Sequence, residues 1–186
     1  MQTVAPPARA RSRGWRGGTS SQIDDVRNQI EVGLKAEAPQ LRALALSKGG
    51  EDDSALALLE PMFDNKEVDV ETGGILGGIY KRVWYRGGMA DHGYLIKSLE
   101  TYQVTYRATG DSYVGINVAA IALLSDRRDD ATRVATVIRD DLGGRSEARL
   151  DHWGCATLAE AYLVLGDIQN AVRWYERAVA RALTRP

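Results

Sequence analysis

The stretch "ETGGILGGIYKRVW", residues 71–84, holds four glycines in six residues and then turns basic and aromatic. A glycine-rich segment of this kind can cradle a phosphate, but Gly73-x4-Gly78 is followed by Ile79-Tyr80 where a phosphate loop carries Lys-Ser/Thr. Glycines spaced four apart instead lie on one face of a helix, where another helix or a bound peptide can approach the bare backbone. The stretch therefore predicts a closely packed helix and argues against a nucleotide site.

Apolar residues recur at helical spacing from residue 22 onward, and the breaks fall at glycine and charge clusters. One stripe runs from Ile23 to Leu34, and a second, Leu41 to Leu46, follows Pro39. The later runs predict helices at residues 55–63, 72–85, 94–108, 113–125, 131–142, 153–165 and 168–183. The only strand-like alternation, "KEVDVE", is short and isolated between helical patterns. The sequence therefore predicts an all-α protein.

The last two predicted helices carry the pattern of a tetratricopeptide repeat, a helical hairpin of about 34 residues. Residues 155–180 read "CATLAEAYLVLGDIQNAVRWYERAVA". The signature residues are Leu158, Ala159 and Tyr162 on the first helix, Gly166 at the turn, and Ala171, Tyr175 and Ala178 on the second helix. This hairpin is a strong match to the repeat.

Weaker copies of the same pattern occur earlier in the chain. Leu76-Gly77-x-x-Tyr80 repeats the first-helix signature, so the opening stretch belongs to a repeat. The small residue of the second helix recurs at intervals of 43, 33 and 40 residues, at Ala55, Ser98, Ala131 and Ala171. Residues 22–186 are therefore predicted to form a tetratricopeptide-like right-handed α-solenoid of about four hairpins, stabilised by stacking. Tyr102 and Tyr175, on second helices, are expected to pack neighbouring hairpins.

Two motifs within this region resemble a known family. "GGIYKR" at residues 77–82 and "YVGINVA" at residues 113–119 are together similar to the TRAFs-binding domain. That tetratricopeptide-like region occurs in the central regulatory part of the apoptosis signal-regulating kinases and in many bacterial proteins. The resemblance covers roughly residues 56–180. It implies a non-catalytic segment for protein binding or regulation in signalling.

Composition narrows the class of protein further. The formal net charge of -1 gives no overall attraction to nucleic acid or to an anionic membrane. No apolar run approaches the roughly 18 residues of a membrane span, and a single cysteine excludes an internal disulfide framework. A cytoplasmic protein is therefore expected.

Residues 1–21 have a different composition and are predicted to be a disordered basic head. They combine prolines, glycines and four arginines with Trp15 as the one large apolar group. The head is read either as a start-site extension or as an arm of a nucleic-acid adaptor. Aromatic residues interleaved with the basic ones are nearly absent, which disfavours nucleic acid as a partner.

Asp151, His152 and Cys155 form the one cluster that suggests catalysis or a metal. A structural zinc site takes about four ligands, and only His92 is left to join these residues. Cys155 also occupies a repeat position that is usually packed, so a buried structural thiol is expected. The sequence thus predicts no catalytic residues, metal or cofactor. The alternative left open is a small hydrolase-like enzyme that uses these three residues.

First helices of such repeats line the concave groove of the solenoid, which defines the candidate site. The partner is expected to be a protein or peptide held in that groove, while its identity and the oligomeric state stay open. The candidate partner-binding residues are Gly74, Gly78, Lys81, Arg82, Tyr113, Asn117 and Glu160.

Overall fold

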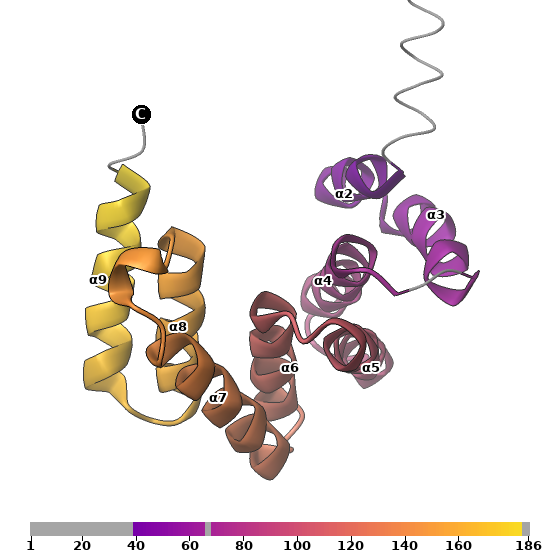
Figure 1. The fold of residues 1–186 in the computed structure, drawn as a ribbon. Helices are drawn as coiled ribbons and strands as arrows, with labels where there is room; N and C mark the ends of the chain where they lie inside the picture. Colours follow the sequence, from indigo (N-terminus) through magenta and orange to yellow (C-terminus); the bar gives the residue numbers. More distant parts are fainter. Residues whose placement is uncertain (1–38, 66–67, 184–186) are drawn as a thin grey trace, which may run out of the picture. The chain divides into compact units, whose positions relative to one another are not determined.

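A computed structural model describes residues 39–65 and 68–183 (Figure 1). By internal contacts the chain divides into a unit of residues 1–38 and a unit of residues 39–186, and the described residues belong to the second. The predicted basic head, the stripe from Ile23 to Leu34 and the domain start at residue 22 lie outside the described residues. Within the described ranges the regular structure is entirely helical, which confirms the all-α prediction. None of these helices is both long and apolar enough to cross a bilayer.

The described helices form successive antiparallel pairs, each helix packing against the next along the chain. The first helices of neighbouring pairs also touch, α2 with α4 and α6 with α8. This arrangement is a tetratricopeptide-like solenoid of four hairpins over the described residues (Figure 1). The pairs are α2 (Pro39–Gly49) with α3 (Asp52–Asn65), α4 (Val70–Arg86) with α5 (His92–Thr109), α6 (Ser112–Leu124) with α7 (Arg128–Gly143), and α8 (His152–Val164) with α9 (Ile168–Leu183). A short 3-10 helix, Glu147–Arg149, lies between α7 and α8.

Most of the observed helices begin one to three residues before the predicted ranges. The polar first turns carry no apolar stripe, and four of them are held by the side chain of a capping aspartate. Asp69 accepts a hydrogen bond from the backbone N–H of Thr72 at 2.7 Å and starts α4 in this way. Asp91, Asp111 and Asp151 cap α5, α6 and α8 by the same kind of bond.

The repeat positions inferred from the small residues are confirmed. Ala55, Ser98, Ala131 and Ala171, one on each second helix, are all buried. Tyr102 on α5 is 1% exposed and packs in the core, as expected. The expectation for Tyr175 on α9 is wrong, because its side chain is 36% exposed. Among the described residues no further hairpin follows α9 to cover this face of the helix.

The backbone of α4 lies unusually close to α5 at two of the glycines in the quoted stretch. A Cβ atom on Gly77 would lie 2.7 Å from the ring of Tyr102, and one on Gly73 would overlap the side chain of Thr105. The hydroxyl of Ser98 also donates to the carbonyl oxygen of Gly77 at 2.7 Å. These two glycines therefore allow α4 to pack closely on α5. This confirms the helix-packing part of the interpretation drawn from the sequence.

Alanine substitutions should separate the two kinds of glycine on α4. Gly77→Ala forces Tyr102 to shift, and we expect the free energy of unfolding to fall by about 1–3 kcal/mol. Gly74→Ala meets no atom nearer than 3.9 Å. The substitution should therefore gain the higher helix propensity of alanine and raise the free energy of unfolding by up to about 1 kcal/mol. Urea denaturation followed by circular dichroism measures both values, and equal effects of the two substitutions would contradict the assigned packing.

Candidate functional site

A groove of about 660 Å³ runs along α4, with side chains of α2 and α6 as its walls. We call it the α4 groove. Its lining is mostly apolar and aromatic, with three charged residues, and the bare backbone of two glycines forms part of its surface. The lining residues are Leu44 of α2, Val70, Glu71, Gly74, Ile75, Gly78, Lys81, Arg82, Trp84 and Tyr85 of α4, Tyr102 of α5, and Tyr113 and Leu124 of α6.

The structure brings most of the predicted site residues together in this groove. Gly74, Gly78, Lys81, Arg82 and Tyr113 all line it. Asn117 of α6 and Glu160 of α8 do not line it, although Asn117 contacts Lys81 directly. Glu160 lies farthest along the chain from the other predicted residues. Its link to them is an electrostatic interaction with Lys81.

Gly74 and Gly78 are open to the groove, unlike their neighbours Gly73 and Gly77. The nearest atom to a Cβ on Gly74 would be Cε1 of Tyr113 at 3.9 Å, and on Gly78 the hydroxyl of Tyr102 at 3.4 Å. An alanine methyl group would fit at both positions. Packing within the described residues therefore does not require either glycine, although each costs roughly 1 kcal/mol relative to alanine inside a helix.

Lys81 joins two first helices, α4 and α6, by a hydrogen bond. Its Nζ donates to Oδ1 of Asn117 at 2.9 Å, and Nδ2 of Asn117 donates to the carbonyl oxygen of Tyr113 at 2.9 Å. Burial lowers the pKa of Lys81, and the negative charge of Glu160 partly opposes that change. Burial likewise raises the pKa of Glu160, partly offset by Lys81. Two partly desolvated groups of opposite charge therefore interact electrostatically beside the groove.

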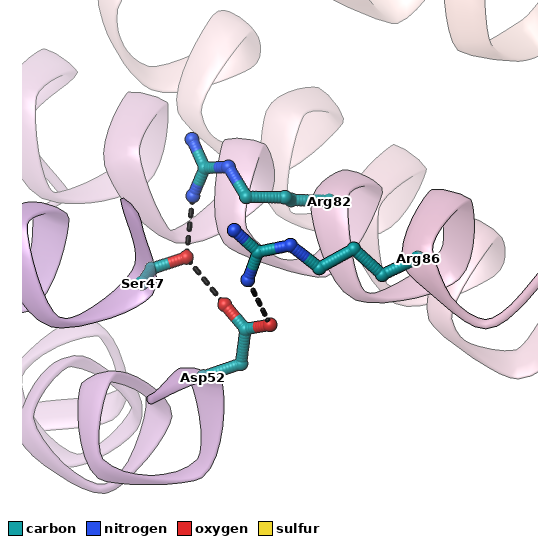
Figure 2. A network of polar contacts seen from close by, with 4 residues as sticks. All are labelled: Ser47, Asp52, Arg82 and Arg86. Atoms are coloured by element: carbon teal, nitrogen blue, oxygen red, sulfur yellow. Dashed lines mark hydrogen bonds and ion pairs between the residues drawn. The ribbon is translucent and has the colours of Figure 1, made fainter. Parts of the chain in front are cut away.

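Arg82 has a structural role in addition to lining the groove. Figure 2 shows its guanidinium donating to the hydroxyl of Ser47, which in turn donates to Oδ1 of Asp52 at 2.5 Å. Arg86 completes the network with an ion pair of 2.7 Å to Oδ2 of the same carboxylate (Figure 2). Ser47 lies on α2 and is fully buried, while Asp52 begins α3. The network therefore fastens α4 to the first hairpin.

Replacing Arg82 should affect stability more than replacing the adjacent lysine. Arg82→Ala removes a charge-assisted hydrogen bond and leaves the Ser47 hydroxyl with one partner fewer, so we expect a loss of about 1–2 kcal/mol of unfolding free energy. Lys81→Gln keeps a donor for Asn117 and should change stability by less than about 0.5 kcal/mol. Urea denaturation of both variants is the measurement. Equal losses would show that the network does not hold the hairpins together.

Sequence reasoning missed part of the groove, above all Trp84. This side chain is 8% exposed, and its indole N–H has no hydrogen-bond partner among the described residues. A buried, unpaired donor costs roughly 1–3 kcal/mol. The aromatic pair Trp84 and Tyr85 was a usable signal, because it closes the same glycine-rich helix. Leu44 and Leu124 carry no such signal, because only folding brings α2 and α6 beside α4.

Asp151, His152 and Cys155 are close in the chain, but each makes a structural contact. The carboxylate of Asp151 caps α8 through the N–H of Gly154 at 2.8 Å, and the His152 ring lies against Trp153. Cys155 is fully buried, as expected, and burial raises the pKa of its thiol while the nearby Arg181 partly opposes this. Within residues 39–65 and 68–183, no group of three or more His, Cys, Asp and Glu residues is placed to hold a metal ion.

The thiol of Cys155 should be unreactive in the folded protein. Because it is fully buried and its pKa is raised, DTNB should not modify it at pH 8 on a timescale of minutes, whereas the reaction should be complete in denaturant. Absorbance of the released thiolate measures both reactions. Rapid modification of the native chain would support an activated thiol and revive the hydrolase-like alternative.

The helical hairpins and the groove on a first helix define a repeat protein of the tetratricopeptide class. Proteins of this class are generally non-catalytic interaction modules. The chain belongs to the Tetratricopeptide Repeats-Sensor family, whose model matches residues 20–124. The match extends to the end of α6 and includes the whole α4 groove. No curated protein matches the chain.

Proposed function

We propose that this protein is a non-catalytic interaction and regulatory module that holds an extended polypeptide segment in the α4 groove. The observation that supports this proposal is the bare backbone at Gly74 and Gly78. Both glycines weaken the helix, and neither is needed by a neighbouring side chain in the described residues. A ligand that approaches the backbone of α4 closely would account for them.

The lining of the groove suggests which polypeptide fits. Most of the groove surface is apolar, with the exposed rings of Tyr85 and Tyr113 available to contact side chains of the segment. Lys81 and Arg82 add two positive groups to the groove, and Glu71 adds one negative group. The preferred segment therefore carries apolar side chains next to a carboxylate.

The biological setting follows from the family and from the resemblance of residues 77–82 and 113–119 to the TRAFs-binding domain. Both support a regulatory role, in which a signalling complex in the cytoplasm responds to occupation of the groove. Asn117 and Glu160 would extend the binding surface from α4 toward α8, because they continue the polar row that begins at Lys81. On this proposal Arg82 contributes mainly by holding α2 and α4 together.

A selection from a random peptide library tests the proposal without knowledge of the natural partner. Peptides that bind the full chain are synthesised with a fluorescent label, and their affinities are measured by fluorescence anisotropy. Gly74→Leu fills the groove, and we expect it to weaken binding at least tenfold, a change of about 1.4 kcal/mol. Lys81→Glu should weaken the binding of peptides that contain a carboxylate by a similar factor.

Gly143→Leu is the matched control for the groove variant. Gly143 is also a helical glycine with no atom within 4 Å of an added Cβ, but it lies at the end of α7. This variant should bind the selected peptides as the unmodified chain does. The proposal fails if the library yields no binder, or if the peptides bind Gly74→Leu and Gly143→Leu equally well.

A further inference from the structure

The charged residues of the α4 groove follow a fixed order along α4. Glu71, Gly74, Gly78 and the pair Lys81 and Arg82 succeed one another at intervals of three or four residues, so they share the helix face that lines the groove. The negative charge lies in the first turn, and the positive charges lie about 15 Å further along the helix axis. The two open glycines lie between them. The groove therefore has a negative end and a positive end.

At the positive end, two cations are held by uncharged partners. Nζ of Lys81 donates to the amide oxygen of Asn117 on α6, and the guanidinium of Arg82 donates to the hydroxyl of Ser47 on α2 (Figure 2). Neither cation forms an ion pair with a carboxylate in the described part of the chain. Because one cation is bound from the α6 wall and the other from the α2 wall, the two flank the groove.

The field of these cations reaches the open backbone at Gly78. Burial raises the pKa of the Tyr102 phenol, and the positive charge of Arg82 partly opposes that rise. The hydroxyl oxygen of Tyr102 would lie 3.4 Å from a Cβ on Gly78. Helical side chains also lean toward the preceding turn, which for Lys81 and Arg82 is the turn of Gly78. An anionic group seated on this glycine would therefore lie between two positive charges.

The negative end of the groove offers a free carboxylate. Glu71 is exposed, and its side chain has neither a hydrogen bond nor an ion pair with another described residue. The start of α4 is already capped by Asp69, which accepts from the backbone N–H of Thr72. An acidic residue in the first turn also complements the helix dipole, but that effect does not require the groove face. Glu71 is therefore available to a cationic group of a ligand.

We propose that the α4 groove selects a segment by its charge pattern, with an acidic residue over Gly78 between Lys81 and Arg82 and a basic residue at Glu71. This inference rests on the proposed function, because it specifies the segment that the groove holds. Residues four positions apart in an extended chain are about 13 Å apart and point to the same side. That spacing matches the separation of the two ends of the groove. The residues between the two charges are apolar and lie over Gly74.

Defined peptides test this charge pattern on the full chain. Fluorescently labelled peptides carry one lysine and one glutamate in a background of leucine and alanine, and fluorescence anisotropy measures their affinities. Either chain direction satisfies the arrangement, so the peptides vary in spacing and charge. With the charges four positions apart, glutamine in place of glutamate should weaken binding about tenfold. Glutamine in place of lysine should weaken it about threefold, because Glu71 is exposed.

The spacing of the charges gives an independent comparison. Peptides with the two charges two or eight positions apart span about 7 Å and about 26 Å, so neither can reach both ends of the groove in an extended form. Both should bind about as weakly as the peptides that lack one charge. Equal affinity at all three spacings would contradict the proposed pattern.

Substitutions in the protein assign each preference to one end of the groove. Glu71→Gln should abolish the preference for lysine, and Glu71→Lys should reverse it in favour of a peptide with two glutamates. Lys81→Gln should reduce the preference for glutamate at least threefold, with Arg82 still in place. Glu100→Gln is the matched control, because Glu100 is an exposed glutamate of α5 outside the groove. This control should keep both preferences.

Failure of this inference can be told apart from failure of the proposed function. If the peptides bind and Gly74→Leu blocks them, but neither charge nor spacing changes the affinity, the charge pattern is wrong and the peptide groove stands. The same conclusion follows if none of these peptides binds while the random library yields binders that Gly74→Leu excludes. Peptides that bind Gly74→Leu as well as the unmodified chain lie outside the groove, and both proposals then fall.

Discussion

The close approach of α4 to α5 is the contact on which the second hairpin and the groove both depend. Gly77 admits the ring of Tyr102, and Gly73 admits Thr105, so the two helices come closer than any side chain on α4 would allow. The same tyrosine then reaches the groove side of α4, where its hydroxyl donates to the carbonyl oxygen of Gly74 at 3.2 Å. The buried ring of Tyr102 therefore packs in the core and also forms part of the groove surface.

The groove is bounded on its other side by a contact of a different kind. The polar network of Arg82, Ser47 and Asp52 fixes α2 beside α4 through charge-assisted hydrogen bonds, whereas α5 is held by steric fit (Figure 2). The steric fit at Gly73 and Gly77 holds α5, the polar network holds α2, and Gly74 adds a carbonyl acceptor for the Tyr102 hydroxyl.

The sequence predicted the helices and the repeat positions well, because apolar spacing and small residues such as Ala55 and Ala131 reflect packing within one hairpin. It predicted five of the groove residues for the same reason, since they share helices with the repeat signature. It could not pair Arg82 with Ser47, which is 35 residues away, because any surface offers many possible polar pairs. The wall residues Leu44 of α2 and Leu124 of α6 could likewise not be assigned to the groove before folding.

Tyr175 shows where a repeat pattern stops being informative. The pattern identifies a residue's position within its hairpin, but burial at that position also requires a neighbouring hairpin, which α5 has and α9 lacks among the described residues. In a solenoid each repeat contacts only its neighbours, so stability is approximately a sum of local terms. The exposed face of α9 is not independent of the first helices, because Glu160 of α8 interacts electrostatically with both Tyr175 and Lys81.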